Sequence, residues 1–208
     1  MQGIFEVKMD LLVRAANAFI ELKKVKYRIV LSAGRNNPIE EILINFCDTD
    51  LYHMLGFQYL SDIALPRSKK RILPEIIKGT KSEGTISKSK FYDNDQLGHN
   101  IKNRIEKVAC IEQFLDSDNY NVFILKDQHN ICTKIKSDYL IVCREISSGN
   151  EYYIFIRRRK GEDGYNIVSC FPKEKISNWG GKRYLMLKEK IINGVPNQLF
   201  KHPNYEEN

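Results

Sequence analysis

The spacing of apolar residues in the first part of the chain predicts a helix followed by a β-hairpin. Residues 9–24 carry apolar side chains at roughly helical spacing, at Leu12, Ala15, Ala16, Phe19, Ile20 and Leu22. Residues 27–32 and 39–46 are rich in β-branched side chains, and the segment between them holds glycine, asparagine and proline, the residues typical of turns. We therefore expect an amphipathic helix over 9–24 and a hairpin over 27–46.

Helical patterns return in the middle of the chain. Residues 51–60 predict a helix with Asp48, Thr49 and Asp50 as candidate N-caps. Residues 63–92 are the least regular, and we expect a short helix there from about Pro74, followed by a loop. Residues 95–115 give the clearest helical pattern, because apolar side chains recur at Ile101, Ile105, Val108, Ile111 and Leu115.

The period then changes to that of short strands. Strands are expected at 121–125, 131–135, 139–145, 152–159 and 165–171, the last two flanking a turn over 161–164. Residues 182–193 predict a final helix closed by Gly194 and Pro196. Helices followed by mostly antiparallel strands indicate an α+β fold, as a single domain over 1–195 with a C-terminal tail over 196–208.

Composition narrows the class of protein. The 208 residues are 42% hydrophobic and 28% charged, which is enough apolar material for a folded core. A run of about 18 apolar residues is missing and charges interrupt the N-terminal segment early, so we expect a cytoplasmic protein without a membrane span. The five cysteines are scattered and form no C-x-x-C pair, which argues against a disulfide framework or a zinc site.

The net charge of +7 is concentrated in clusters. Three of them stand out in the sequence: Arg67, Lys69, Lys70 and Arg71; Lys78, Lys81, Lys88 and Lys90; and Arg157, Arg158, Arg159 and Lys160. Any one of these could be a solvated surface, but three on one small domain favour phosphate binding.

Motif inspection excludes several chemistries. The sequence has no phosphate-binding G-x-x-x-x-G-K-[ST] loop, no H-E-x-x-H helix, no G-x-S-x-G elbow and no clustered carboxylates. Neither a cofactor nor a metal is therefore expected. Metal-free RNA cleavage needs only a base for the ribose 2′-OH, a cation for the phosphorane and an acid for the leaving 5′-oxygen, and spacing alone cannot reveal such residues.

One segment resembles a known family. Asp50 to Ile63, DLYHMLGFQYLSDI, is similar to the H-L-x-G-L-x-x-L-x-D-I block of a phage-associated branch of the Barnase-EndoU-Colicin-RelE (BECR) nuclease superfamily. Weaker matches follow in order over 19–171: the hairpin YRIVLSAGR, Lys88 to Phe91, Arg104, Ser137 to Leu140, and Val168 to Phe171. Met54, Leu55, Phe57 and Cys170 depart from the family pattern while remaining apolar.

The resemblance implies a barnase- or RelE-like nuclease fold, with helices packed on an antiparallel sheet. The concave face of that sheet would hold RNA, tRNA among the candidate substrates. It also implies a toxin, effector or phage conflict role, with an antitoxin or immunity protein as a candidate partner. This group activity rests on fold similarity. Two alternatives stay open: a catalytically inactive module of the same fold that binds RNA or protein, and a scaffold protein of a mobile element.

Four residues are the candidate catalytic set. His53 is the first candidate for base or acid, since imidazole titrates near neutral pH, although it could equally pack the helix. Ser169 is expected to share a strand face with Tyr165, Ile167 and Phe171, and a four-residue turn would aim Arg158 at the same face. Arg104 borders the apolar stripe of its helix and could clamp a phosphorane or form a surface ion pair.

The candidate RNA-binding residues come from the basic clusters and from the irregular segment, where loops often carry function. They are Lys69, Lys70, Arg71, Lys88, Ser89, Lys90, Arg157 and Arg159. His99 and His129 are expected at the surface, and His202 falls in the tail.

Overall fold

The fold comes from a computed structural model that describes residues 9–34, 39–93, 100–125, 135–145, 148–161, 163–173 and 180–206. The expected strand over 131–135 lies largely outside these ranges, as do Cys132, His99 and His129. Within them the helices are short, and they are α1 (Leu11–Leu22), α2 (Asp50–Met54), η1 (Phe57–Tyr59), η2 (Lys69–Arg71), α3 (Ile72–Ile77), α4 (Glu83–Ile86), α5 (Ile101–Val108) and α6 (Ile111–Asp116).

The strands make up most of the regular structure. They are β1 (Val25–Ser32), β2 (Ile39–Ile44), β3 (Tyr120–Ile124), β4 (Tyr139–Arg144), β5 (Glu151–Arg158), β6 (Tyr165–Pro172), β7 (Gly181–Ile192) and β8 (Val195–Lys201). Neighbouring strands run in the order β1-β2-β6-β5-β4-β3-β7-β8, and β1 also pairs with β7. Seven strands therefore close into a ring, and β8 extends from β7.

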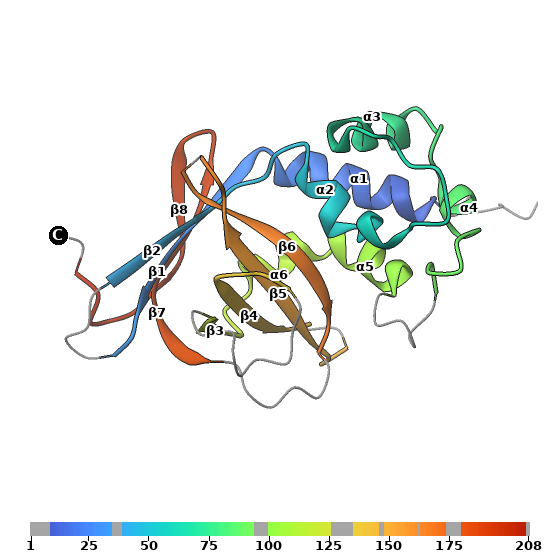
Figure 1. Cartoon of the computed structure of the whole chain (residues 1–208). Coiled ribbons are helices and arrows are strands. Elements are labelled where there is room, and N and C mark those ends of the chain that lie inside the picture. The colour runs from blue at the N-terminus through green and yellow to red at the C-terminus, as the bar shows by residue number, and fades with distance from the viewer. Residues whose placement is uncertain are drawn as a thin grey trace, which may run out of the picture.

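The expected fold class, helices packed on an antiparallel sheet, is wrong. The structure is a closed seven-stranded mixed barrel with an eighth strand and a few short helices, because β1 pairs with β7 and β2 runs parallel to β6. Figure 1 shows α1 to α5 gathered on one side of the strands. No helix of the described part of the chain is both long and apolar enough to cross a membrane.

The closing strand β7 occupies the segment expected to be the last helix. Asn193 (φ 52°) and Gly194 (φ 81°) both adopt the left-handed backbone that a tight β-hairpin turn requires. Ile192 consequently pairs with Val195, and the residues expected to form a tail become β8. Tyr205 beyond β8 is buried beside Val30 and Leu187, so this end of the chain is held against the barrel.

The expected hairpin and helices are confirmed in part. β1 and β2 pair antiparallel with Ser32 opposite Ile39, and α1 begins where Asp10 accepts hydrogen bonds from the amides of Leu12 and Val13. The helix expected over 51–60 breaks at Gly56, whose φ of 75° ends α2 and starts η1. The helix expected over 95–115 is divided into α5 and α6 at Ala109 and Cys110.

The main core lies between the strands and the helices. It joins alternate residues of β1, such as Tyr27, Ile29 and Leu31, to the apolar faces of α1, α2, α5 and α6. A second cluster includes Tyr153, Phe155 and Val168, with Phe171 packed against it. The two clusters therefore cover the strand faces on which their residues lie.

Candidate active site

A surface pocket of about 430 Å³ lies where α2 meets the hairpin of β5 and β6. The segment from β2 into α2 supplies one wall, and the end of β5, the turn after it and β6 supply the other. The described residues that line the pocket are predominantly polar or charged: Cys47, Thr49, Asp50, His53, Arg157, Arg158, Arg159, Lys160 and Asn166. A pocket of this size takes a ligand as large as a nucleotide.

The pocket walls are joined by a buried ion pair. The Arg159 guanidinium binds both carboxylate oxygens of Asp50 at 3.1 and 2.5 Å, and both side chains are more than nine-tenths buried. Arg159 also donates to the side chain and the carbonyl of Asn45, while Asp50 accepts from the backbone amide of Cys47 at 2.8 Å. This network fixes the start of α2, and thereby His53, relative to the end of β5.

His53 projects from α2 into this pocket and is half-buried. Its Nε2 lies 2.9 Å from the Lys69 ammonium of η2. An ammonium group only donates, so Nε2 accepts and the ring proton of the neutral imidazole lies on Nδ1. Burial lowers the pKa of His53 below its usual value, the charges of Lys69 and Arg157 lower it further, and Asp50 partly opposes them. His53 is therefore neutral at pH 7.

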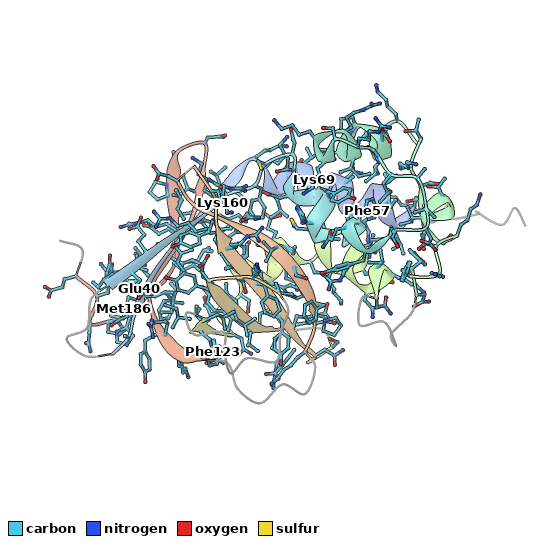
Figure 2. All side chains as sticks on the ribbon, viewed as in Figure 1. Glu40, Phe57, Lys69, Phe123, Lys160 and Met186 are labelled. Carbon is cyan, nitrogen blue, oxygen red and sulfur yellow. The ribbon has the colours of Figure 1, made fainter. Side chains whose placement is uncertain are left out.

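The pocket is cationic because most of its charges are not neutralised. Arg157, Arg158 and Lys160 form no ion pair with any other described residue, whereas Asp50, the carboxylate of the lining, is held by Arg159. Lys69, on η2, adds a fourth positive charge to those of Arg157, Arg158 and Lys160. Figure 2 shows Lys69 near α2 and Lys160 at the hairpin end, both at the upper side of the view. Such an arrangement favours an anion such as a phosphate.

The hairpin register differs from the one expected for a four-residue turn. Arg158 pairs with Tyr165, Ile156 with Ile167, and Phe155 with Ser169, with a shift between Phe155 and Ile156. This irregularity breaks the expected alternation along β6. Ile167 packs in the main core and Phe171 against the second cluster, so the two do not share a strand face. Arg158 nevertheless reaches the pocket from the end of β5.

Arg104 and Ser169 meet, but not in the pocket. The Arg104 guanidinium of α5 donates to the Ser169 hydroxyl, and both residues are more than nine-tenths buried. The Arg104 guanidinium carbon lies 5.3 Å from the Tyr59 ring centre and 5.0 Å from the Phe171 ring centre. Gly56 packs so closely that a Cβ there would lie 2.7 Å from Arg104 Cδ. Arg104 thus joins the end of α2, through Gly56, to β6.

The other candidate RNA-binding residues fall into two groups. Lys69, Lys70 and Arg71 form η2 and are exposed beside α2. Lys88 and Lys90 are also exposed, whereas Ser89 is buried and donates to Asp62 at 2.5 Å. The Ser89–Asp62 hydrogen bond also lowers the pKa of the Asp62 carboxyl. Ser89 therefore holds its loop in place rather than presenting a hydroxyl to solvent.

Five residues of the pocket lining were missing from the sequence-based site residues: Cys47, Thr49, Asp50, Lys160 and Asn166. Lys160 ends the basic run of the third cluster, and its position there was the available signal. Asn166 lines the pocket because it pairs with Arg157 across the hairpin, which only the register reveals. Thr49 was noted as a helix cap, yet its side chain makes no capping bond and faces the pocket region, 3.1 Å from the Cys47 sulfur.

Across the described ranges, His, Cys, Asp and Glu side chains form no group of three or more that could hold a metal ion. What the pocket does provide is a neutral imidazole among guanidinium and ammonium groups. Those are the components of a site that binds a phosphate and moves a proton beside it, as in phosphodiester chemistry.

The chain matches a family model of nucleases. Residues 11–198 match the phage-Barnase-EndoU-ColicinE5/D-RelE like nuclease 4 model, and the chain belongs to this nuclease family. The resemblance to the phage-associated BECR branch is thereby confirmed. No curated protein and no solved structure matches the chain.

Proposed function

We propose that the protein is a metal-independent endoribonuclease that cleaves RNA, tRNA among the candidate substrates, by attack of the ribose 2′-oxygen on the adjacent phosphorus. The observation that carries this proposal is the neutral His53 in a pocket with Arg157, Arg158 and Lys160. A neutral imidazole can accept a proton at pH 7, and the cations stabilise the charge that develops on the phosphorane.

The proposed step assigns a role to each group. His53 Nε2 accepts the 2′-OH proton, the 2′-oxygen forms a bond to phosphorus, and the bond to the 5′-oxygen breaks. Lys69 is the candidate donor of the proton that the 5′-oxygen takes, because its ammonium already lies at the imidazole. The products are a 2′,3′-cyclic phosphate and a 5′-hydroxyl. Arg104 and Ser169, buried outside the pocket lining, are assigned to positioning α2 rather than to the reacting atoms.

The same His53–Lys69 contact supports a second candidate function, RNA binding without cleavage. Lys69 occupies the Nε2 lone pair that a base must use, so Lys69 has to move to the substrate phosphate before proton transfer. If it does not move, the site binds RNA and leaves it intact. A toxin or phage conflict role, and an antitoxin or immunity partner, remain proposals that rest on the family.

A single 2′-deoxy substitution tests the cleavage step. An RNA oligonucleotide that the protein cuts at one bond is compared with the same oligonucleotide lacking only the 2′-OH before that bond. The proposal predicts that the substitution abolishes cleavage there while other sites remain cut. Cleavage that persists at the 2′-deoxy position contradicts 2′-oxygen attack.

A further inference from the structure

Asn166 is a neutral polar side chain in an otherwise cationic pocket. The residue is more than nine-tenths buried, and it lines the pocket together with His53 and Arg157. Its neighbours Tyr165 and Ile167 contact the main core, so alternation along β6 turns the Asn166 side chain away from that core. Directly opposite residues of an antiparallel pair share a face, and the partner of Asn166 is Arg157.

The Asn166 amide has no hydrogen-bond partner among the described residues. The side-chain atoms of Asn166 are also not among the polar atoms of the described residues that are both fully enclosed and without a hydrogen-bond partner. The amide is thus accessible through the pocket while the rest of the residue is buried. Buried polar groups in folded proteins are nearly always hydrogen-bonded, so an unpartnered amide facing a pocket points to a ligand group.

The chemistry of the lining indicates which part of a nucleotide meets this amide. The guanidinium and ammonium groups suit the phosphate. Bases of single-stranded RNA are recognised by stacking on aromatic side chains, and the described lining contains no Phe, Tyr or Trp. A ribose hydroxyl is neutral, donates and accepts, and therefore matches an amide that does both.

We propose that Asn166 binds the ribose 2′-hydroxyl of the nucleotide whose phosphate occupies the pocket, and that this contact makes the site prefer RNA to DNA. The inference rests on the proposed function, because it requires a nucleotide in this pocket. The 2′-hydroxyl is the group by which a protein distinguishes the two nucleic acids at a given site. A hydrogen bond there also fixes the oxygen that His53 deprotonates.

Nucleoside 3′-monophosphates test this contact without cleavage, because they lack the bond to a leaving 5′-oxygen. Binding of adenosine 3′-monophosphate and of its 2′-deoxy analogue is measured by calorimetry for the full chain. Asn166→Leu removes the amide at similar volume, Asn166→Ala serves if the leucine variant does not fold, and Asn121→Ala, an exposed asparagine on β3, is the control. Arg158→Ala reports phosphate binding in the pocket separately.

The expected result is that the parent and the Asn121 control bind the ribonucleotide about fivefold to tenfold tighter than the deoxynucleotide. The Asn166 variants should bind both ligands equally, at the deoxynucleotide level. The inference is overturned if the parent binds both ligands with equal affinity and Arg158→Ala weakens that binding, although the phosphate pocket is then still supported. The inference is also overturned if the Asn166 variants lose affinity for both ligands to the same extent. Binding of neither ligand by the parent contradicts the proposed function and the inference together.

Discussion

The Lys69 ammonium donates a hydrogen bond to Nε2 of His53, 16 residues earlier in the chain. The contact connects η2, which carries the first basic cluster, to α2, which carries the candidate base. It fixes the tautomer of the imidazole and adds positive charge beside it. In the proposed mechanism, a cluster that sequence patterns assign to RNA binding is therefore also part of the proton chemistry.

Replacing Lys69 should raise the pKa of His53. Lys69→Gln can still donate to Nε2 but carries no charge, and the positive charge is one of the causes that lower the His53 pKa. The imidazole should then titrate at higher pH, and the acidic limb of the cleavage rate should move in the same direction. An NMR titration of the His53 ring protons measures the pKa directly, with Lys70→Gln as the neighbouring control. An unchanged His53 pKa in Lys69→Gln refutes the electrostatic role.

Replacing Arg158 should weaken RNA binding, whereas replacing the adjacent Arg159 should lower the stability of the protein. Arg159→Leu leaves Asp50 buried without its partner and should cost about 3 kcal/mol of unfolding free energy. Arg158 is exposed and makes no ion pair with the described residues, so Arg158→Ala should change stability by less than about 0.5 kcal/mol while weakening RNA binding.

Urea unfolding and RNA titration of both arginine variants separate these effects. The double change Asp50→Asn with Arg159→Leu should recover part of the lost stability, because it leaves no unpaired buried charge. A stable Arg159→Leu protein with selectively weakened RNA binding would show instead that Arg159 contacts RNA.

Gly56→Ala should destabilise the protein by more than its backbone conformation explains. Gly56 and Gly79 have nearly the same φ, 75° and 73°. A Cβ at Gly56 would lie 2.7 Å from Arg104 Cδ and 2.8 Å from Ile101 Cδ1, whereas nothing lies within 4 Å at Gly79. Gly79→Ala should lower the free energy of unfolding by about 1 kcal/mol. Gly56→Ala should lower it by about 1 kcal/mol more than that, or by a larger amount. Equal losses in urea unfolding would show that the close packing of Gly56 on Arg104 does not matter.

Arg104 and Ser169 should be coupled in stability. The hydrogen bond from the buried guanidinium to the serine hydroxyl should give a coupling of about 1.5 kcal/mol or more in a double-mutant cycle of Arg104→Met and Ser169→Ala. Ser169→Ala alone should leave the product end groups and the pH profile of cleavage unchanged. A loss of cleavage at full stability would place Ser169 among the reacting groups.

Local patterns predicted the elements that depend on neighbours in sequence. The apolar stripe of α1, the hairpin of β1 and β2, and the strands β3 to β6 are all specified by residues close together in the sequence. The barrel was missed because it depends on distant pairing. Lys188 shows why: it lies in the segment expected to be the last helix, yet on β7 it is fully buried and donates to the carbonyls of Asp116 and Ser117 at the end of α6. The Asn193-Gly194 dipeptide was the local signal for β7 and β8.

For the candidate site, the sequence likewise predicted single residues but not the contacts between them. His53 and Arg158 were chosen from sequence and do share a pocket. The partners that organise it are separated by 16 residues for Lys69 and His53 and by 109 for Arg159 and Asp50. Asn166 depends on a register that the shift near Phe155 alters. Periodicity carries no information on such contacts, so only the fold reveals them.

Cleavage of RNA in excess EDTA by the parent protein, by His53→Ala and by His202→Ala tests the central claim most directly. His202 lies beyond β8 and is absent from the pocket lining, so its variant controls for histidine loss in general. The account predicts that the parent and His202→Ala leave 2′,3′-cyclic phosphate ends on total tRNA or on other RNA, and that His53→Ala leaves the RNA intact. Equal cleavage by His53→Ala, or activity only when a metal is restored, would contradict it.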